Sequence, residues 1–74
     1  MAGSLNDHVT AEIRAELGRQ HRSAANLAAE LGWTSPFLSR RLTGEIALDM
    51  RDLEAIADCL RVPLAKLMPA EVAS

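Results

Sequence analysis

The chain has little cysteine, few aromatic residues and no long apolar run. Its 74 residues include one cysteine, one phenylalanine, one tryptophan and no tyrosine. A single cysteine, Cys59, excludes an internal disulfide and a cysteine-rich zinc site, and β-branched and aromatic residues are too scarce for an extensive sheet. No apolar stretch reaches the length of a membrane span, and the basic-then-apolar pattern of a signal peptide is missing. We therefore expect one small, soluble, all-α domain in a reducing cytosol, without membrane contact.

Motifs that would indicate catalysis are also missing. The two histidines, His8 and His21, do not stand at metal-ligand spacing from Cys59 or from any acidic cluster. The sequence contains no glycine-rich phosphate loop and no nucleophile elbow. We predict that the protein is not an enzyme and has no metal, no cofactor and no small-molecule substrate.

Alanine and leucine, which are strong helix formers, supply most of the apolar residues. The spacing of apolar residues predicts a first helix over about 6–19. Ser23 is a suitable N-cap for a second helix that ends at Gly32, and Thr34 for a third that ends at Gly44. The buried stripes of these three helices are predicted to contain Val9, Ile13, Leu17, Leu27, Leu31, Leu38 and Leu42.

Two further helices are predicted in the second half of the chain. Asp49 is a suitable N-cap for the fourth, and a short fifth helix is expected to end at Pro69. The sequence thus predicts a single domain over 6–69, with flexible ends at 1–5 and 70–74. The buried stripe of the fourth helix is predicted to contain Met50, Leu53, Ile56, Ala57 and Leu60.

Charge is distributed unevenly along the chain. The net charge is −2, yet residues 13–44 contain five arginines and only two glutamates, whereas the flanking parts are acidic. A basic segment within an acidic protein is typical of a domain that binds nucleic acid with one face. An ordinary mixed surface is the alternative. The five arginines are Arg14, Arg19, Arg22, Arg40 and Arg41.

One pattern within 23–40 identifies a family. It has the form S-x-x-x-L-A-x-x-L-G-x-(S/T)-x-x-x-(L/I)-S-R and consists here of Ser23, Leu27-Ala28, Leu31-Gly32, Thr34 and Leu38-Ser39-Arg40. The chain resembles the lambda-repressor-like helix-turn-helix domains of the Cro/C1 (XRE) type, found in phage repressors and small bacterial regulators. The resemblance runs from about residue 9 to residue 68, without insertion or deletion. It implies a compact five-helix bundle in which the second and third helices form the helix-turn-helix.

The resemblance also implies a function, that of a sequence-specific transcriptional regulator of the repressor type, which binds double-stranded DNA in the bacterial cytosol or nucleoid. Its recognition helix, 34–43, would lie in the major groove. The family's base-contacting positions fall on Ser35, Pro36, Ser39 and Arg40. Arg40 is the best candidate for a direct base contact, because a guanidinium can bond bidentately to guanine.

Contacts to DNA phosphates are expected from hydroxyls and arginines around the same helices. This chain departs from the family at Ala24, where relatives often carry glutamine, and at Glu45, where they often carry a basic residue. Arg22 and Arg41 occupy positions that are commonly apolar. The loss of phosphate partners predicts modest affinity for a monomer. The expected phosphate-contacting residues are Ser23, Arg19, Arg22, Thr34, Arg41 and Thr43.

A single recognition helix covers too few base pairs to select one site, so we expect a weak homodimer on a pseudo-palindromic operator. Leu64 and Met68 are the candidate dimer contacts. The alternative function is a helix-turn-helix module that binds a protein partner, as an antitoxin or anti-activator does. The acidic second half of the chain and Glu45 favour that alternative, and the arginines of the recognition helix oppose it.

Overall fold

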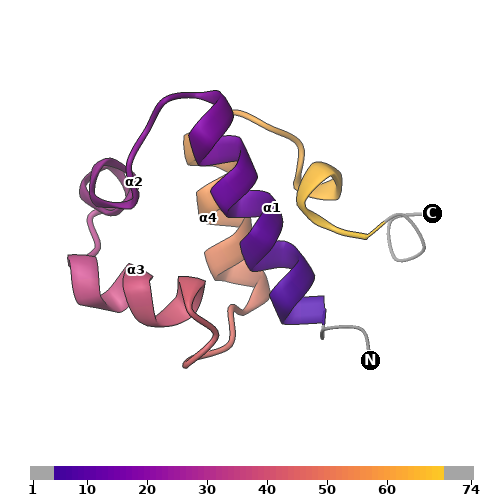
Figure 1. The fold of residues 1–74 in the computed structure, drawn as a ribbon, viewed down its shortest axis with the longest axis horizontal. Helices are drawn as coiled ribbons and strands as arrows, with labels where there is room; N and C mark the ends of the chain where they lie inside the picture. The colour runs from indigo at the N-terminus through magenta and orange to yellow at the C-terminus, as the bar shows by residue number, and fades with distance from the viewer. Residues whose placement is uncertain (1–4, 70–74) are drawn as a thin grey trace.

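The computed structural model describes residues 5–69, which are helical and contain no strand (Figure 1). This confirms the predicted all-α class. Within this range no helix is both long and apolar enough to cross a membrane. The elements are α1 (Leu5–Arg19), α2 (Ala24–Leu31), α3 (Ser35–Leu42), α4 (Met50–Leu60) and the 3₁₀ turn η1 (Leu64–Leu67).

The predicted fifth helix is this single 3₁₀ turn. Pro63 and Pro69 enclose a segment of only five residues, too short to accumulate α-helical hydrogen bonds. The bonds that form instead span three residues, from the Lys66 N–H to the Pro63 carbonyl and from the Met68 N–H to the Ala65 carbonyl. At the N-terminal end, Leu5 was expected to be flexible but is the first residue of α1. The other residues expected to be flexible, 1–4 and 70–74, lie outside the described residues.

The elements surround one apolar core. In Figure 1, α1 lies across α4, with α2 and α3 to one side of this pair and η1 on the other side of α1. The core side chains are at most 6% exposed, and they include nearly all of the predicted stripe residues. Leu31 is half-buried at the edge. The core consists of Val9, Ile13, Leu17, Leu27, Ala28, Leu38, Leu42, Leu53, Ile56, Ala57, Leu60 and Leu67.

The prediction that Met50 is buried is wrong. Its side chain is 52% exposed, because it is the first residue of α4 and lies a full turn before Leu53, where that helix enters the core. Leu5 and Ile46 are also exposed.

The link between α2 and α3 has a defined geometry. Gly32 ends α2 in the left-handed conformation with a φ of 75°. Its N–H donates to the Ala29 carbonyl, and the Trp33 N–H donates to the Ala28 carbonyl at 2.9 Å, which together form a Schellman motif. Thr34 then begins the next helix, since its Oγ1 accepts the Phe37 N–H at 3.2 Å. These bonds fix the direction of α3 relative to α2.

Two other helices end in the same motif without a glycine. His21 follows α1 with a φ of 55°, and Arg61 follows α4 with a φ of 61°. In this conformation the β-carbon of an L-residue crowds the following carbonyl, at a cost of roughly 1–2 kcal/mol. The motif forms nonetheless, because the Arg22 N–H donates to the Leu17 carbonyl at 2.9 Å.

We expect His21→Gly to stabilise the protein by about 1 kcal/mol, since glycine removes the left-handed strain at a moderate entropic cost. His21 is exposed, so the substitution removes little else. Thermal unfolding should show a midpoint about 4–8 °C higher. His21→Ala is the matched control, because alanine retains the β-carbon. Equal stabilisation by alanine and glycine would contradict the explanation.

Candidate nucleic-acid interface

The exposed side of α3 is the starting point of the site. Leu38 and Leu42 lie one turn apart and point into the core, so the opposite side of this helix faces solvent. All four predicted base-contacting residues are exposed on it. Arg40 has no polar side-chain partner within residues 5–69. The four residues are Ser35, Pro36, Ser39 and Arg40.

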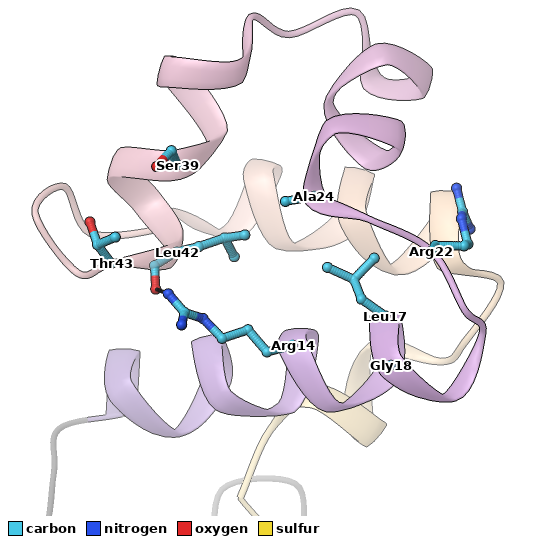
Figure 2. A pocket seen from close by; sticks show the side chains of 8 residues that line it. All are labelled: Arg14, Leu17, Gly18, Arg22, Ala24, Ser39, Leu42 and Thr43. Carbon is cyan, nitrogen blue, oxygen red and sulfur yellow. Dashed lines mark hydrogen bonds between the residues drawn. The ribbon is translucent and has the colours of Figure 1, made fainter.

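A groove of about 340 Å³ lies beside this face, between α1, the start of α2 and the second half of α3 (Figure 2). Ser39 lines it from α3 and Thr43 from the position directly after α3, and Ala24 lines it from the first position of α2. Arg14 enters from α1, and its Nη2 donates to the Leu42 carbonyl at 2.6 Å. Arg14 was not among the predicted site residues, because its position beside α3 depends on how two distant segments pack.

The two predicted phosphate-contacting hydroxyls at helix starts have structural roles. Ser23 Oγ accepts the Asn26 N–H at 3.0 Å, and the Asn26 side chain accepts in return from the Ser23 N–H, which completes a capping box at α2. Thr34 caps α3 in the same manner. The N-terminal end of each helix carries a partial positive charge, which favours an anion there. Contact of Ser23 and Thr34 with phosphate stays a prediction.

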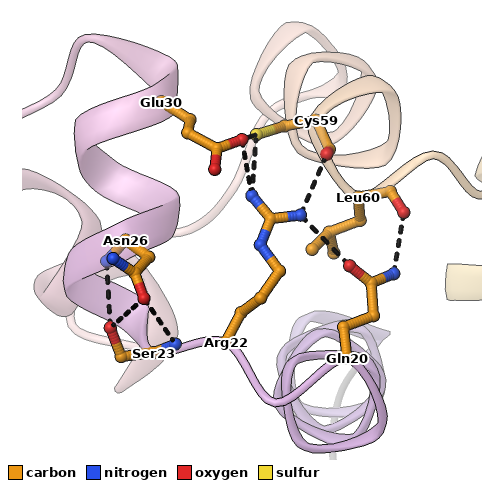
Figure 3. Close-up of polar contacts among 7 residues, drawn as sticks. All are labelled: Gln20, Arg22, Ser23, Asn26, Glu30, Cys59 and Leu60. Atoms are coloured by element: carbon orange, nitrogen blue, oxygen red, sulfur yellow. Dashed lines mark hydrogen bonds and ion pairs between the residues drawn. The ribbon is translucent and has the colours of Figure 1, made fainter.

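Arg22 lies at the centre of a polar cluster that joins three segments (Figure 3). Its guanidinium forms an ion pair with Glu30 at 2.6 Å and donates to Gln20 and to the Cys59 carbonyl, each at 3.1 Å. The Cys59 thiol donates to the Glu30 carboxylate at 3.3 Å. The side chain of Arg22 is only 19% exposed. It therefore connects the α1–α2 link to the ends of α2 and α4.

These contacts shift the protonation equilibria of the cluster. The hydrogen bond from Cys59 and the charge of Arg22 lower the pKa of Glu30. Burial raises the pKa of the Cys59 thiol, and the adjacent Glu30 carboxylate raises it further. The cluster thus holds an ionised glutamate and a protonated thiol near neutral pH.

The guanidinium of Arg41 is likewise bound to other residues of the protein. Its Nε lies 3.3 Å from Asp52, and its Nη1 donates to the Phe37 carbonyl at 2.9 Å. Its guanidinium carbon lies 3.5 Å from the centre of the Phe37 ring, a cation–π contact, and Trp33 packs edge-on against the same ring. The side chain is 14% exposed. Arg41 thus connects α3 to α4.

The remaining predicted arginine, Arg19, forms an ion pair with Glu16 at 3.0 Å and is half exposed. Three of the five arginines in 13–44 are therefore paired with a carboxylate. Within the part of the chain that the structure describes, Arg14 and Arg40 are the two in this segment with no such partner. Two of the paired arginines, Arg22 and Arg41, are the ones that the sequence pattern marked as departures from the family it resembles.

Of the other predicted residues, Thr43 lines the groove, whereas Leu64 and Met68 do not. Thr43 Oγ1 donates to the Arg40 carbonyl at 3.2 Å. Leu64 and Met68 are both half-buried against the core. Residues 5–69 contain no group of three or more His, Cys, Asp or Glu side chains that could hold a metal ion.

A helix-turn-helix family model matches residues 12–67, which is most of the chain. The chain belongs to this family, of the Cro/C1 type. It is therefore a DNA-binding helix-turn-helix regulator, and α2 and α3 are the pair of helices that give the family its name. No curated protein and no solved structure matches the chain, so this family match carries the assignment.

The ion pairs of this helix-turn-helix domain predict a loss of stability in acid. A hydrogen bond from Gln20 lowers the pKa of Glu16, and the Cys59 thiol lowers that of Glu30. Each group is expected to bind protons more weakly in the folded chain than in the unfolded one. The stabilisation is therefore complete above the ordinary value of about 4.3 and is lost as pH falls through the lower folded pKa.

We expect the thermal midpoint of the protein to fall between about pH 5 and pH 3, and to fall less in the double variant Glu16→Gln/Glu30→Gln. Glu12→Gln is the matched control, because Glu12 has no ion pair among the described residues. An unchanged pH profile in the double variant would show that other carboxylates cause the acid sensitivity.

Proposed function

We propose that this helix-turn-helix domain is a sequence-specific repressor of the phage or bacterial Cro/C1 type, which inserts α3 into the major groove of its operator. The observation that carries the proposal is the exposed side of α3, where Arg40 has no carboxylate partner within residues 5–69. Such a side chain can approach a base edge without first breaking an ion pair, and the buried Leu38 and Leu42 hold the helix in place behind it.

Each exposed residue of α3 has a role in this proposal. Arg40 donates to O6 and N7 of a guanine, a pairing worth roughly 1–3 kcal/mol of discrimination. Ser35 and Ser39 form hydrogen bonds with bases or phosphates, and Pro36 contacts a thymine methyl group. Phosphate contacts come from the starts of α2 and α3, from Thr43 at the end of α3, and from Arg19, whose side chain is half exposed.

A dimer on a pseudo-palindromic operator completes the proposal. One α3 helix contacts only a few base pairs, so two copies are needed to select a site. Leu64 and Met68, half-buried at the surface of the core, are the candidate contacts for a weak dimer that forms mainly on DNA. The protein would act in the bacterial cytosol or nucleoid, with no catalytic step, cofactor or small-molecule substrate.

A second candidate function is a module that binds a protein partner, such as an antitoxin or anti-activator. Exposed apolar side chains favour it: Leu5, Ile46 and Met50 are 48%, 38% and 52% exposed. Glu45, just after α3, would repel DNA phosphates. Binding to duplex DNA with a strong dependence on salt would separate the two functions, since that dependence arises from phosphate contacts.

The test is selection of bound duplexes from a randomised library, with the wild-type protein and with Arg40→Ala. We expect the wild type to enrich an inverted repeat whose half-sites are about one helical turn apart. Arg40→Ala should keep the fold and lose preference at one base position in each half-site, by roughly 1–3 kcal/mol.

Two results would contradict the proposal at different levels. A uniform loss of affinity in Arg40→Ala, with an unchanged sequence profile, would show that Arg40 contacts phosphate and not a base. An absence of duplex binding by the wild type at low salt would remove the repressor function and favour the protein-binding module. Thermal unfolding of Arg40→Ala is the control for altered folding.

A further inference from the structure

Arg14 is the one unpaired arginine near α3 to which neither the sequence nor the family match assigns a role. It stands on α1, and its guanidinium reaches the C-terminal end of α3 (Figure 2). Its one hydrogen-bond partner within the described residues is the carbonyl of Leu42. A carbonyl is neutral, so this bond orients the guanidinium and leaves its full positive charge uncompensated.

The surroundings of Arg14 are those of an anion site. The groove is also lined by Ser39 from α3 and by Thr43, which directly follows α3. Ala24 forms the facing wall, and its short side chain leaves the groove open toward the N-terminal end of α2, where the helix dipole is positive. The hydroxyl of Ser39, a positive helix end and an uncompensated guanidinium thus border one space, while the hydroxyl of Thr43 donates to the Arg40 carbonyl. In Figure 2 the guanidinium of Arg22 points away from it.

No carboxylate lines this groove. The two acidic residues of 13–44 are paired elsewhere, Glu16 with Arg19 and Lys66, and Glu30 with Arg22. The local charge balance at the groove therefore differs from that of the whole chain, which is acidic. A phosphodiester entering the groove would meet positive charge and hydrogen-bond donors together.

We propose that this groove binds a phosphate of the DNA backbone and that Arg14 is its principal ligand. The inference rests on the proposed function, since it assumes that α3 lies in the major groove beside that phosphate. One Nη of Arg14 stays on the Leu42 carbonyl, and the remaining N–H groups of the guanidinium donate to phosphate oxygens. Arg14 thus supplies, from α1, a phosphate contact that Arg22 and Arg41 cannot provide without breaking their ion pairs.

The test measures the affinity of Arg14→Gln for a duplex as a function of salt. We expect the slope of log K against log salt to be smaller by about one, and affinity at about 0.1 M salt to fall about tenfold, equally for specific and nonspecific duplexes. Arg14→Lys, which keeps the charge, should restore most of the slope. Lys66→Gln is the charge-matched control, because Lys66 lies on η1, on the other side of α1 (Figure 1).

A second arm locates the contact. Duplexes that carry a neutral methylphosphonate at one position each should include one that weakens the wild type but leaves Arg14→Gln unaffected. Thermal unfolding of both proteins shows whether loss of the Leu42 bond has disturbed the fold, and Arg14→Lys shows whether charge alone restores binding.

The inference and the proposed function fail in different ways. If the wild type binds duplexes with a steep salt slope and Arg14→Gln binds with the same slope, Arg14 is not a phosphate ligand and only the inference is overturned. An equal loss in Arg14→Gln and Lys66→Gln would show an effect of net charge and would also overturn it. If the wild type does not bind any duplex at low salt, the proposed function itself is overturned.

Discussion

The three-residue link between α2 and α3 is the constraint on which the rest of the site depends. Gly32 allows α2 to end in a left-handed turn, and Thr34 caps α3 two residues later, so the chain reverses within a fixed geometry. That geometry directs Leu38 into the core and consequently directs Arg40 and its neighbours outward. A residue at position 32 with a β-carbon would strain the turn at a cost of roughly 1–2 kcal/mol, as His21 and Arg61 do at the ends of their helices.

Pairing with carboxylates and burial divide four of the five arginines in 13–44 into two groups; the fifth, Arg19, is paired with Glu16 but half exposed. Arg22 and Arg41 are mostly buried, and each joins helices that are distant in sequence. Arg14 and Arg40 have no acidic partner in the part that the structure describes, and both border the exposed side of α3. Each of these arginines adds one positive charge to residues 13–44. Only a guanidinium whose charge is not compensated by a carboxylate gives DNA a strong electrostatic partner. The account therefore assigns the first pair to the fold and the second pair to the ligand.

Most of the fold could be predicted from local patterns. Caps at Ser23, Thr34 and Asp49 and apolar residues at helical spacing fixed the helices to within about one residue. The exposed position of Met50 could not be predicted, because periodicity does not show where a helix leaves the core. The 3₁₀ conformation of η1 could not be predicted either. It results from two prolines that enclose a short segment, and the spacing of apolar residues does not show that effect. Arg14 was missed for a third reason, since its proximity to Leu42 exists only after packing.

The central claim is that Arg14 and Arg40 contact DNA whereas Arg22 and Arg41 hold the helices together. The most direct measurement is NMR of the arginine guanidinium N–H groups, both Nε–Hε and Nη–Hη, assigned by substitution, with and without an operator duplex. The account predicts that the signals of Arg14 and Arg40 shift on binding and slow their exchange with solvent. Those of Arg22 and Arg41 should already be protected in the free protein and change little. Large shifts at Arg22 and Arg41, with Arg14 and Arg40 unaffected, would contradict the account.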